Sequence, residues 1–133
     1  MGMLAAKFNI AAEQGSTFNL TFVWKDKDGV VVDLTALDML INISPAFGTA
    51  RVKYGNWYAA GKTQTGEITI GPTDISTPSG TDGKIVISIT AAEMATWEYR
   101  DYVYMVEITT GDGVTKYRVA EGAFNVYKEI PNS

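Results

Sequence analysis

The fold class of this chain is decided by residues 14–29, which read QGSTFNLTFVWKDKDG. Large apolar side chains recur at every second position from Phe18 to Trp24, with smaller or polar residues between them. Because successive side chains of a strand point to opposite faces, this period of two predicts a strand with one buried face. The Asp28-Gly29 pair that follows predicts a hairpin turn, since both residues tolerate a positive φ.

The same period of two recurs further along the chain. It places Leu37, Met39, Ile41 and Ile43 on one side of a strand at 37–43, and it recurs at 84–89 and 102–109. Short strands at this spacing, separated by turn residues, are typical of a sandwich. We therefore predict an all-β fold: an antiparallel, immunoglobulin-like (Ig-like) β-sandwich of about eight strands.

One short helix interrupts this pattern near residues 91–97. Thr90 followed three residues later by Glu93 is a capping box, the usual start of a helix. Met94 and Trp97 are three residues apart, so both should face the core. The helix is expected to connect two strands without changing the fold class.

The chain has 133 residues, which predicts a single sandwich domain spanning 1–133. Within it, residues 53–83 are rich in Gly, Ser, Thr and Pro, with one short strand expected at 67–70. We predict a long loop region there, and long loops in compact domains are often binding elements. A plain solvated connection is the alternative.

Composition narrows the classes of function that the chain could have. Histidine and cysteine are absent, which removes disulfides, thiolate nucleophiles and the commonest general base and transition-metal ligand. The net charge is -4 and no basic cluster occurs, so nucleic-acid binding is not expected. The sequence contains no run of 18 apolar residues, so no membrane-spanning helix is expected. Residues 1–7 lack the features of a signal peptide. We expect synthesis in the cytoplasm and no enzyme activity, metal or cofactor.

Two local matches to known binding motifs fail on spacing. Gly55 to Thr63 resembles a phosphate loop but has five residues between its glycines instead of four. The segment from Asp26 to Gly29 resembles the start of a calcium loop, but Val30 and Leu37 stand where oxygen ligands are required. A loop and a hairpin turn are the better interpretations.

Aromatic and two-sided apolar segments are the candidate interaction sites. The strand at 102–109 carries Val103 and Met105 on the face opposite its other apolar residues. Either this strand is central and covered, or its second face meets another subunit. Aromatic residues on the expected 53–83 loop and near the C-terminus are further candidates. The predicted interface residues are Tyr54, Trp57, Tyr58, Val103, Met105 and Tyr127.

Four motifs in order suggest a biological setting. The first is the opening stretch with VDLT at 32–35, the second is GKIVISITAAE at 83–93, the third is YVYMVEIT at 102–109 with GDG at 111–113, and the fourth is VAEGAFNV at 119–126. Together they resemble small β-sandwich structural proteins of tailed bacteriophages, and are similar to the N-terminal domain of upper baseplate proteins. The resemblance covers most of the chain.

This resemblance implies a non-enzymatic virion structural protein of the tail, baseplate or neck, made in the host cytoplasm and located in the virion. Its partners would be other virion proteins and further copies of itself in a symmetric assembly. One alternative is a capsid decoration protein. Another is a carbohydrate-binding, host-adhesion module that stacks a glycan on Tyr54, Trp57 and Tyr58.

Overall fold

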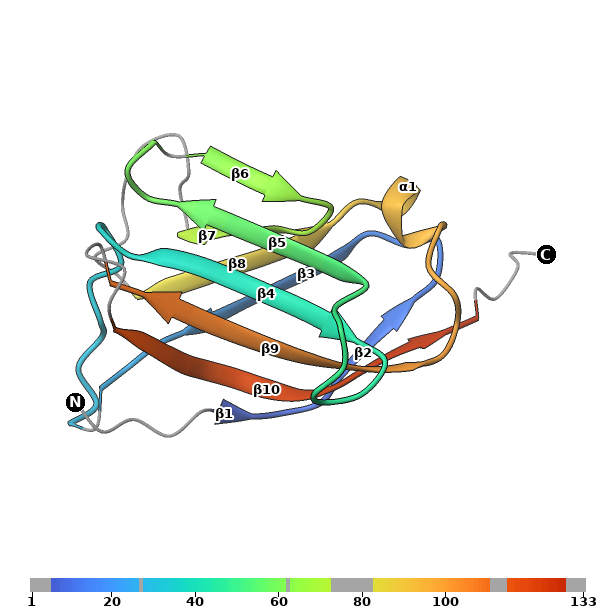
Figure 1. Cartoon of the computed structure of the whole chain (residues 1–133), viewed down its shortest axis with the longest axis horizontal. Coiled ribbons are helices and arrows are strands. Elements are labelled where there is room, and N and C mark those ends of the chain that lie inside the picture. The colour runs from blue at the N-terminus through green and yellow to red at the C-terminus, as the bar shows by residue number, and fades with distance from the viewer. Residues whose placement is uncertain (1–5, 27, 62, 73–82, 111–114, 129–133) are drawn as a thin grey trace.

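Two β-sheets lie face to face in the computed structural model, which describes residues 6–26, 28–61, 63–72, 83–110 and 115–128 (Figure 1). Strands make up 58% of the structure and helix makes up 4%, which confirms the all-β prediction. The described elements are β1 (Ala6–Lys7), β2 (Ile10–Glu13), β3 (Phe18–Val23), β4 (Asp38–Ser44), β5 (Lys53–Tyr58), β6 (Thr63–Gly66), β7 (Thr69–Pro72), β8 (Lys84–Ile89), α1 (Ala91–Met94), β9 (Asp101–Thr109) and β10 (Lys116–Tyr127).

The strand order is that of a variable-type immunoglobulin sandwich. Sheet A runs β1-β10-β9-β4-β5-β6, with β2 also paired to β10, and sheet B runs β3-β8-β7 behind it (Figure 1). Strands β10, β9, β4, β5 and β6 take the places of G, F, C, C′ and C″, while β3, β8 and β7 take those of B, E and D. The predicted sandwich is therefore confirmed, although β1 and β2 run parallel to β10.

The opening stretch forms the strand and hairpin that its pattern predicts. Along β3 the inward positions are half-buried and the outward positions exposed, in strict alternation. At the turn, the Asp26 Oδ1 atom accepts hydrogen bonds from the backbone N–H groups of Asp28 and Val30, at 2.9 and 3.0 Å. Gly29 has a φ of +81°, the left-handed conformation that glycine adopts without strain. Hydrogen bonds within residues 26–30 therefore shape this turn as the sequence predicts.

Helix α1 begins where the capping residue predicts. The Thr90 hydroxyl accepts a hydrogen bond from the Glu93 backbone N–H at 3.1 Å. Met94 and Trp97 are both buried, as the spacing predicts. The Glu93 carboxylate accepts hydrogen bonds from the side chains of Lys53, Thr96 and Trp97 in place of the reciprocal capping contact.

The predicted loop at 53–83 is wrong over its first two thirds, because residues 53–72 carry β5, β6 and β7. The glycines that suggested a loop serve close packing. A Cβ atom built on Gly55 would lie 2.1 Å from the Ile68 carbonyl oxygen, and one on Gly66 would lie 2.4 Å from the Tyr54 carbonyl oxygen. Neither position has room for a side chain. Residues 73–82 of the predicted loop lie outside the described residues.

Strand β10 is a single strand of 12 residues and pairs with β9. Its register with β9 shifts between Arg118 and Ala120, which marks a bulge. At Gly122 the crossing N-terminal segment comes so close that an added Cβ atom would lie 2.2 Å from the Phe8 carbonyl oxygen. This glycine lets one strand hold both β1 and β2.

Aromatic rings join the two sheets, where antibody domains use a disulfide. Phe18 of sheet B packs edge-on against Phe124 of sheet A, with ring centroids 5.4 Å apart. Tyr102, at the start of β9, donates its hydroxyl hydrogen to the Glu98 carbonyl oxygen at 3.3 Å, as in the tyrosine corner of this fold. Tyr104, two residues later, occupies the position of the second cysteine and packs on Phe124.

Candidate interaction surface

The outer side of sheet A carries a continuous uncharged area. Along β4 and β9, buried residues alternate with half-buried residues that point away from sheet B. Register places β5 and β9 on either side of β4, so the outward residues of the three strands adjoin. We call this area, with the loop residue above it, the outer sheet face: Leu40, Asn42, Ser44, Phe47, Tyr54, Val103, Met105 and Ala123.

Phe47 projects from the loop between β4 and β5. The loop is closed by Thr49, whose hydroxyl donates to the Ala46 carbonyl oxygen at 2.7 Å, and by Gly48 with a φ of +84°. This turn leaves Phe47 56% exposed, the only phenylalanine among the exposed large hydrophobic residues of the described chain. Beneath it, a recess of about 150 Å³ reaches to Val103 and Met105. A rigid turn thus presents an apolar side chain beside a hollow.

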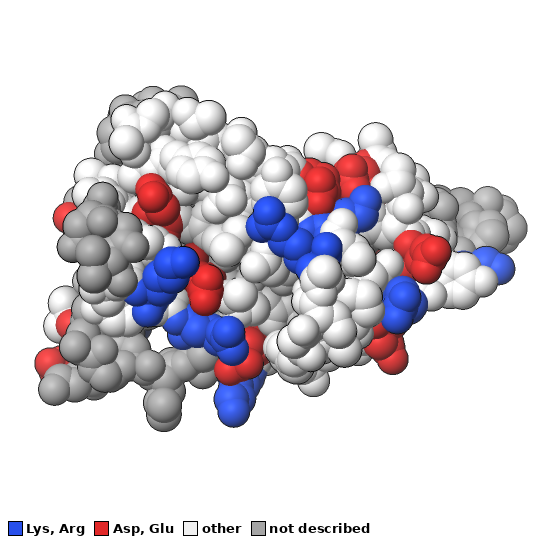
Figure 2. All heavy atoms as spheres, viewed as in Figure 1, with Lys and Arg blue, Asp and Glu red and all other residues white. Residues whose placement is uncertain are grey.

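Charged residues of both signs surround this uncharged centre. Arg51 donates from Nη1 to the Asn42 Oδ1 atom at 3.1 Å, and its guanidinium group lies 3.9 Å from the centre of the Tyr54 ring. Arg118 and Glu121 form an exposed ion pair at 3.8 Å. Seen from the side of sheet A, positive and negative groups are interspersed (Figure 2). The face therefore has no single-sign field.

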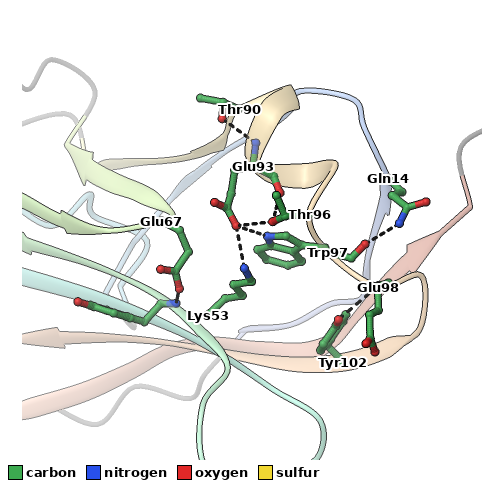
Figure 3. A network of polar contacts seen from close by, with 10 residues as sticks. Gln14, Lys53, Glu67, Thr90, Glu93, Thr96, Trp97, Glu98 and Tyr102 are labelled. Atoms are coloured by element: carbon green, nitrogen blue, oxygen red, sulfur yellow. Dashed lines mark hydrogen bonds and ion pairs between the residues drawn. The ribbon is translucent and has the colours of Figure 1, made fainter.

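A polar network holds β5, and with it Tyr54, in place (Figure 3). Glu93 accepts hydrogen bonds from the Lys53 ammonium at 2.9 Å and from the Trp97 indole N–H at 2.7 Å. The Glu67 carboxylate accepts from the Tyr54 backbone N–H at 2.7 Å. Partial burial works to raise the pKa of Glu93, but the bonds from Lys53 and Trp97 outweigh it and lower that pKa. The network ties α1 to β5.

The structure brings three of the six predicted interface residues together. Tyr54, Val103 and Met105 lie on the outer sheet face. The prediction for Trp57 rested on a loop and is corrected, because Trp57 points inward from β5 and is 4% exposed. Tyr58 and Tyr127, at the ends of β5 and β10, are exposed but outside this face.

Sequence reasoning did not single out Phe47 and Arg51. Phe47 lies in a Pro-Ala-Phe-Gly segment, and a large apolar residue inside such a turn is a signal that could have found it. No sequence feature indicates that Arg51 would lie over Tyr54. Its position depends on the pairing of β4 with β5.

The surface has the anatomy of a protein contact. Interfaces commonly have an uncharged, partly aromatic centre and a polar or charged rim. Within the described residues, no three acidic side chains gather to hold a metal ion, and no helix is long and apolar enough to cross a bilayer. No protein-family model matches the chain, and no curated protein matches it.

Proposed function

We propose that this chain is a non-enzymatic structural protein of a bacteriophage virion, a component of the tail, baseplate or neck that scaffolds assembly through repeated protein contacts. The observation that carries the proposal is the outer sheet face, where exposed Phe47 stands over an uncharged centre with charges of both signs around it. A symmetric assembly repeats one such patch many times, so a modest contact per copy suffices.

The placement of the four phage-like motifs supports the same proposal. The first falls on β3 and its hairpin, the second on β8 and α1, the third on β9, and the fourth on β10. These elements form the inner scaffold and its sheet pairing. The resemblance supports a shared architecture, and its motifs on β9 and β10 include Val103, Met105 and Ala123 of the outer sheet face.

The host-adhesion alternative loses part of its basis. The Trp57 ring is buried and cannot stack on a sugar in this structure, and the Tyr54 ring is covered on one side by Arg51. Tyr58 alone of the three is largely exposed. The capsid decoration alternative would use the same kind of surface, and copy number in the particle separates it from a tail component.

Fractionation of virions tests the proposed function. Purified particles from the source of this sequence are split into heads and tails, and the chain is quantified in each fraction by mass spectrometry. We expect a fixed multiple of three or six copies in the tail fraction. Hundreds of copies in the head fraction would indicate decoration, and absence from both fractions would contradict a virion role.

A further inference from the structure

We propose that the partner of the outer sheet face is a second copy of this chain, packed face to face about a two-fold axis, with Arg51 of each copy paired to Glu107 of the other. This inference rests on the proposed function, since it names the first contact of the assembly. It is carried by two oppositely charged side chains on the same face that lack an ion-pair partner within the described chain.

Arg51 is the cationic half of the pair. Its guanidinium group carries five N–H donors, of which the bond to Asn42 uses one. Its flat side is occupied by the Tyr54 ring, which holds the group against the face. Within the part of the chain that the structure describes, no carboxylate lies within ion-pair distance of Arg51. A fixed guanidinium group with unused donors is suited to a carboxylate from outside.

Glu107 is the anionic half. It points outward from β9, half-buried, opposite Leu40 on one side and Arg118 on the other. Despite that register, no cation comes within ion-pair distance of its carboxylate among the described residues. Arg118 instead reaches toward Glu121. Glu107 is therefore a half-buried residue that forms no ion pair with another described residue, next to the uncharged centre.

Strand β4 lies between the two charges. Asn42 is paired with Tyr54, under Arg51, while Leu40 is paired with Glu107. A two-fold axis running in the interface over β4, midway between the charges, brings Arg51 of one copy onto Glu107 of the other and repeats the contact in reverse. Residues on the axis meet their own copies, which places Leu40 beside the Leu40 of the second copy.

The charges around the face fit a second copy. Charges of both signs adjoin this face, with Arg51 and Arg118 on it beside Glu107 and Glu121, so two identical faces can meet with opposite charges opposed. A stable interface buries about 800 Å² per partner, so a stable dimer would need the contact to extend to the loop that carries Phe47.

Charge reversal tests this pairing directly. The self-association of the full chain is measured by sedimentation equilibrium, with circular dichroism confirming that each variant folds. We expect a dimer for the unchanged chain, and a dissociation constant at least about tenfold higher for Arg51→Glu or Glu107→Arg, because the two-fold axis repeats each repulsion. The double variant Arg51→Glu/Glu107→Arg should recover the dimer.

Mixing the two single variants gives the sharpest readout. Arg51→Glu mixed with Glu107→Arg should form a mixed dimer, since both contacts then join opposite charges. Each variant alone should self-associate only weakly. The position of the two-fold axis is checked with variants that carry one cysteine each. Because the unchanged chain has no cysteine, any disulfide must join the two introduced residues. Leu40→Cys should form an interchain disulfide on oxidation. Thr21→Cys, on the exposed outer side of β3, is the matched control and should not.

The outcomes separate this inference from the proposed function. A monomer at all concentrations, or a dimer indifferent to both charge reversals, would overturn the face-to-face pairing. Neither result changes where the chain is found in fractionated virions. Conversely, the two single variants could form a mixed dimer while the chain is absent from particles. That result would support the face-to-face dimer and contradict the virion role.

Discussion

The outer sides of the two sheets differ, although their strands show the same alternating pattern. On β3 the outward residues Asn19, Thr21 and Val23 are exposed. On β9 the outward residues Val103 and Met105 are half-buried beside neighbouring strands on both sides. An edge strand leaves its outer side to water, whereas a central strand offers a broad surface. The comparison teaches that the apolar second face of β9 reflects its central position and leaves that face open to a partner.

The largest expected effect concerns the interior that both sheets share. Phe124 is fully buried and packs against Phe18, Trp97 and Tyr104. Phe124→Ala should lower the free energy of unfolding by about 3–5 kcal/mol, because it removes the ring that links the sheets. Urea denaturation measures the change. Thr21→Ala on the outer side of sheet B is the control and should stay within about 0.5 kcal/mol.

An intermediate effect is expected where α1 is tied to sheet A. Glu93→Gln removes the charge that Lys53 and Trp97 hydrogen-bond, and should cost about 1–2 kcal/mol at neutral pH. Because the pKa of Glu93 is lower in the folded chain than its ordinary 4.5, its contribution is present above that pH and is lost as the pH falls through the folded value.

The pH dependence supplies the check. The difference in unfolding free energy between the Glu93→Gln variant and the unchanged chain should therefore shrink in acid. Glu98→Gln is the matched control, because the Glu98 residue is exposed. A difference between the Glu93→Gln variant and the unchanged chain that stayed constant from neutral pH to pH 3 would show that the carboxylate charge is not what the network uses.

The smallest expected effect falls on the outer sheet face. Phe47→Ser should change the free energy of unfolding of the monomer by no more than about 0.5 kcal/mol, since the ring is mostly exposed. The measurement is made at low protein concentration, so that association does not add apparent stability. A loss of several kcal/mol would place Phe47 in the core and remove the contrast between the two outer sides.

Local patterns predicted the fold well where one rule acts alone. The alternation in β3, β4 and β9, the Asp28-Gly29 hairpin and the Thr90 cap are each set within a few residues of sequence. These features suffice for an all-β sandwich. Val103 and Met105 could be proposed as surface residues from the same alternation, whereas Tyr54 was proposed from an expected loop that is β5 in the structure.

Long-range packing decided what the sequence did not reveal. Gly55 and Gly66 suggest a loop until Ile68 and Tyr54 are brought against them. The buried state of Trp57 depends on which side of β5 faces sheet B, and that follows from its register with β4. The position of Arg51 over the Tyr54 ring likewise depends on the pairing of β5 with β4.

The pairing of β2 with β10 sets the order in which the chain can fold. Ile10 lies opposite Phe124, so the first and last strands of the sandwich must meet across almost the entire chain. Closing so long a loop is slow, and contacts of this kind form late. During synthesis the N-terminal segment has no strand to join until β10 has left the ribosome. The edge of β10 is thus the last part of the sandwich to be covered, and a chain cut short before β10 would leave β2 without a partner.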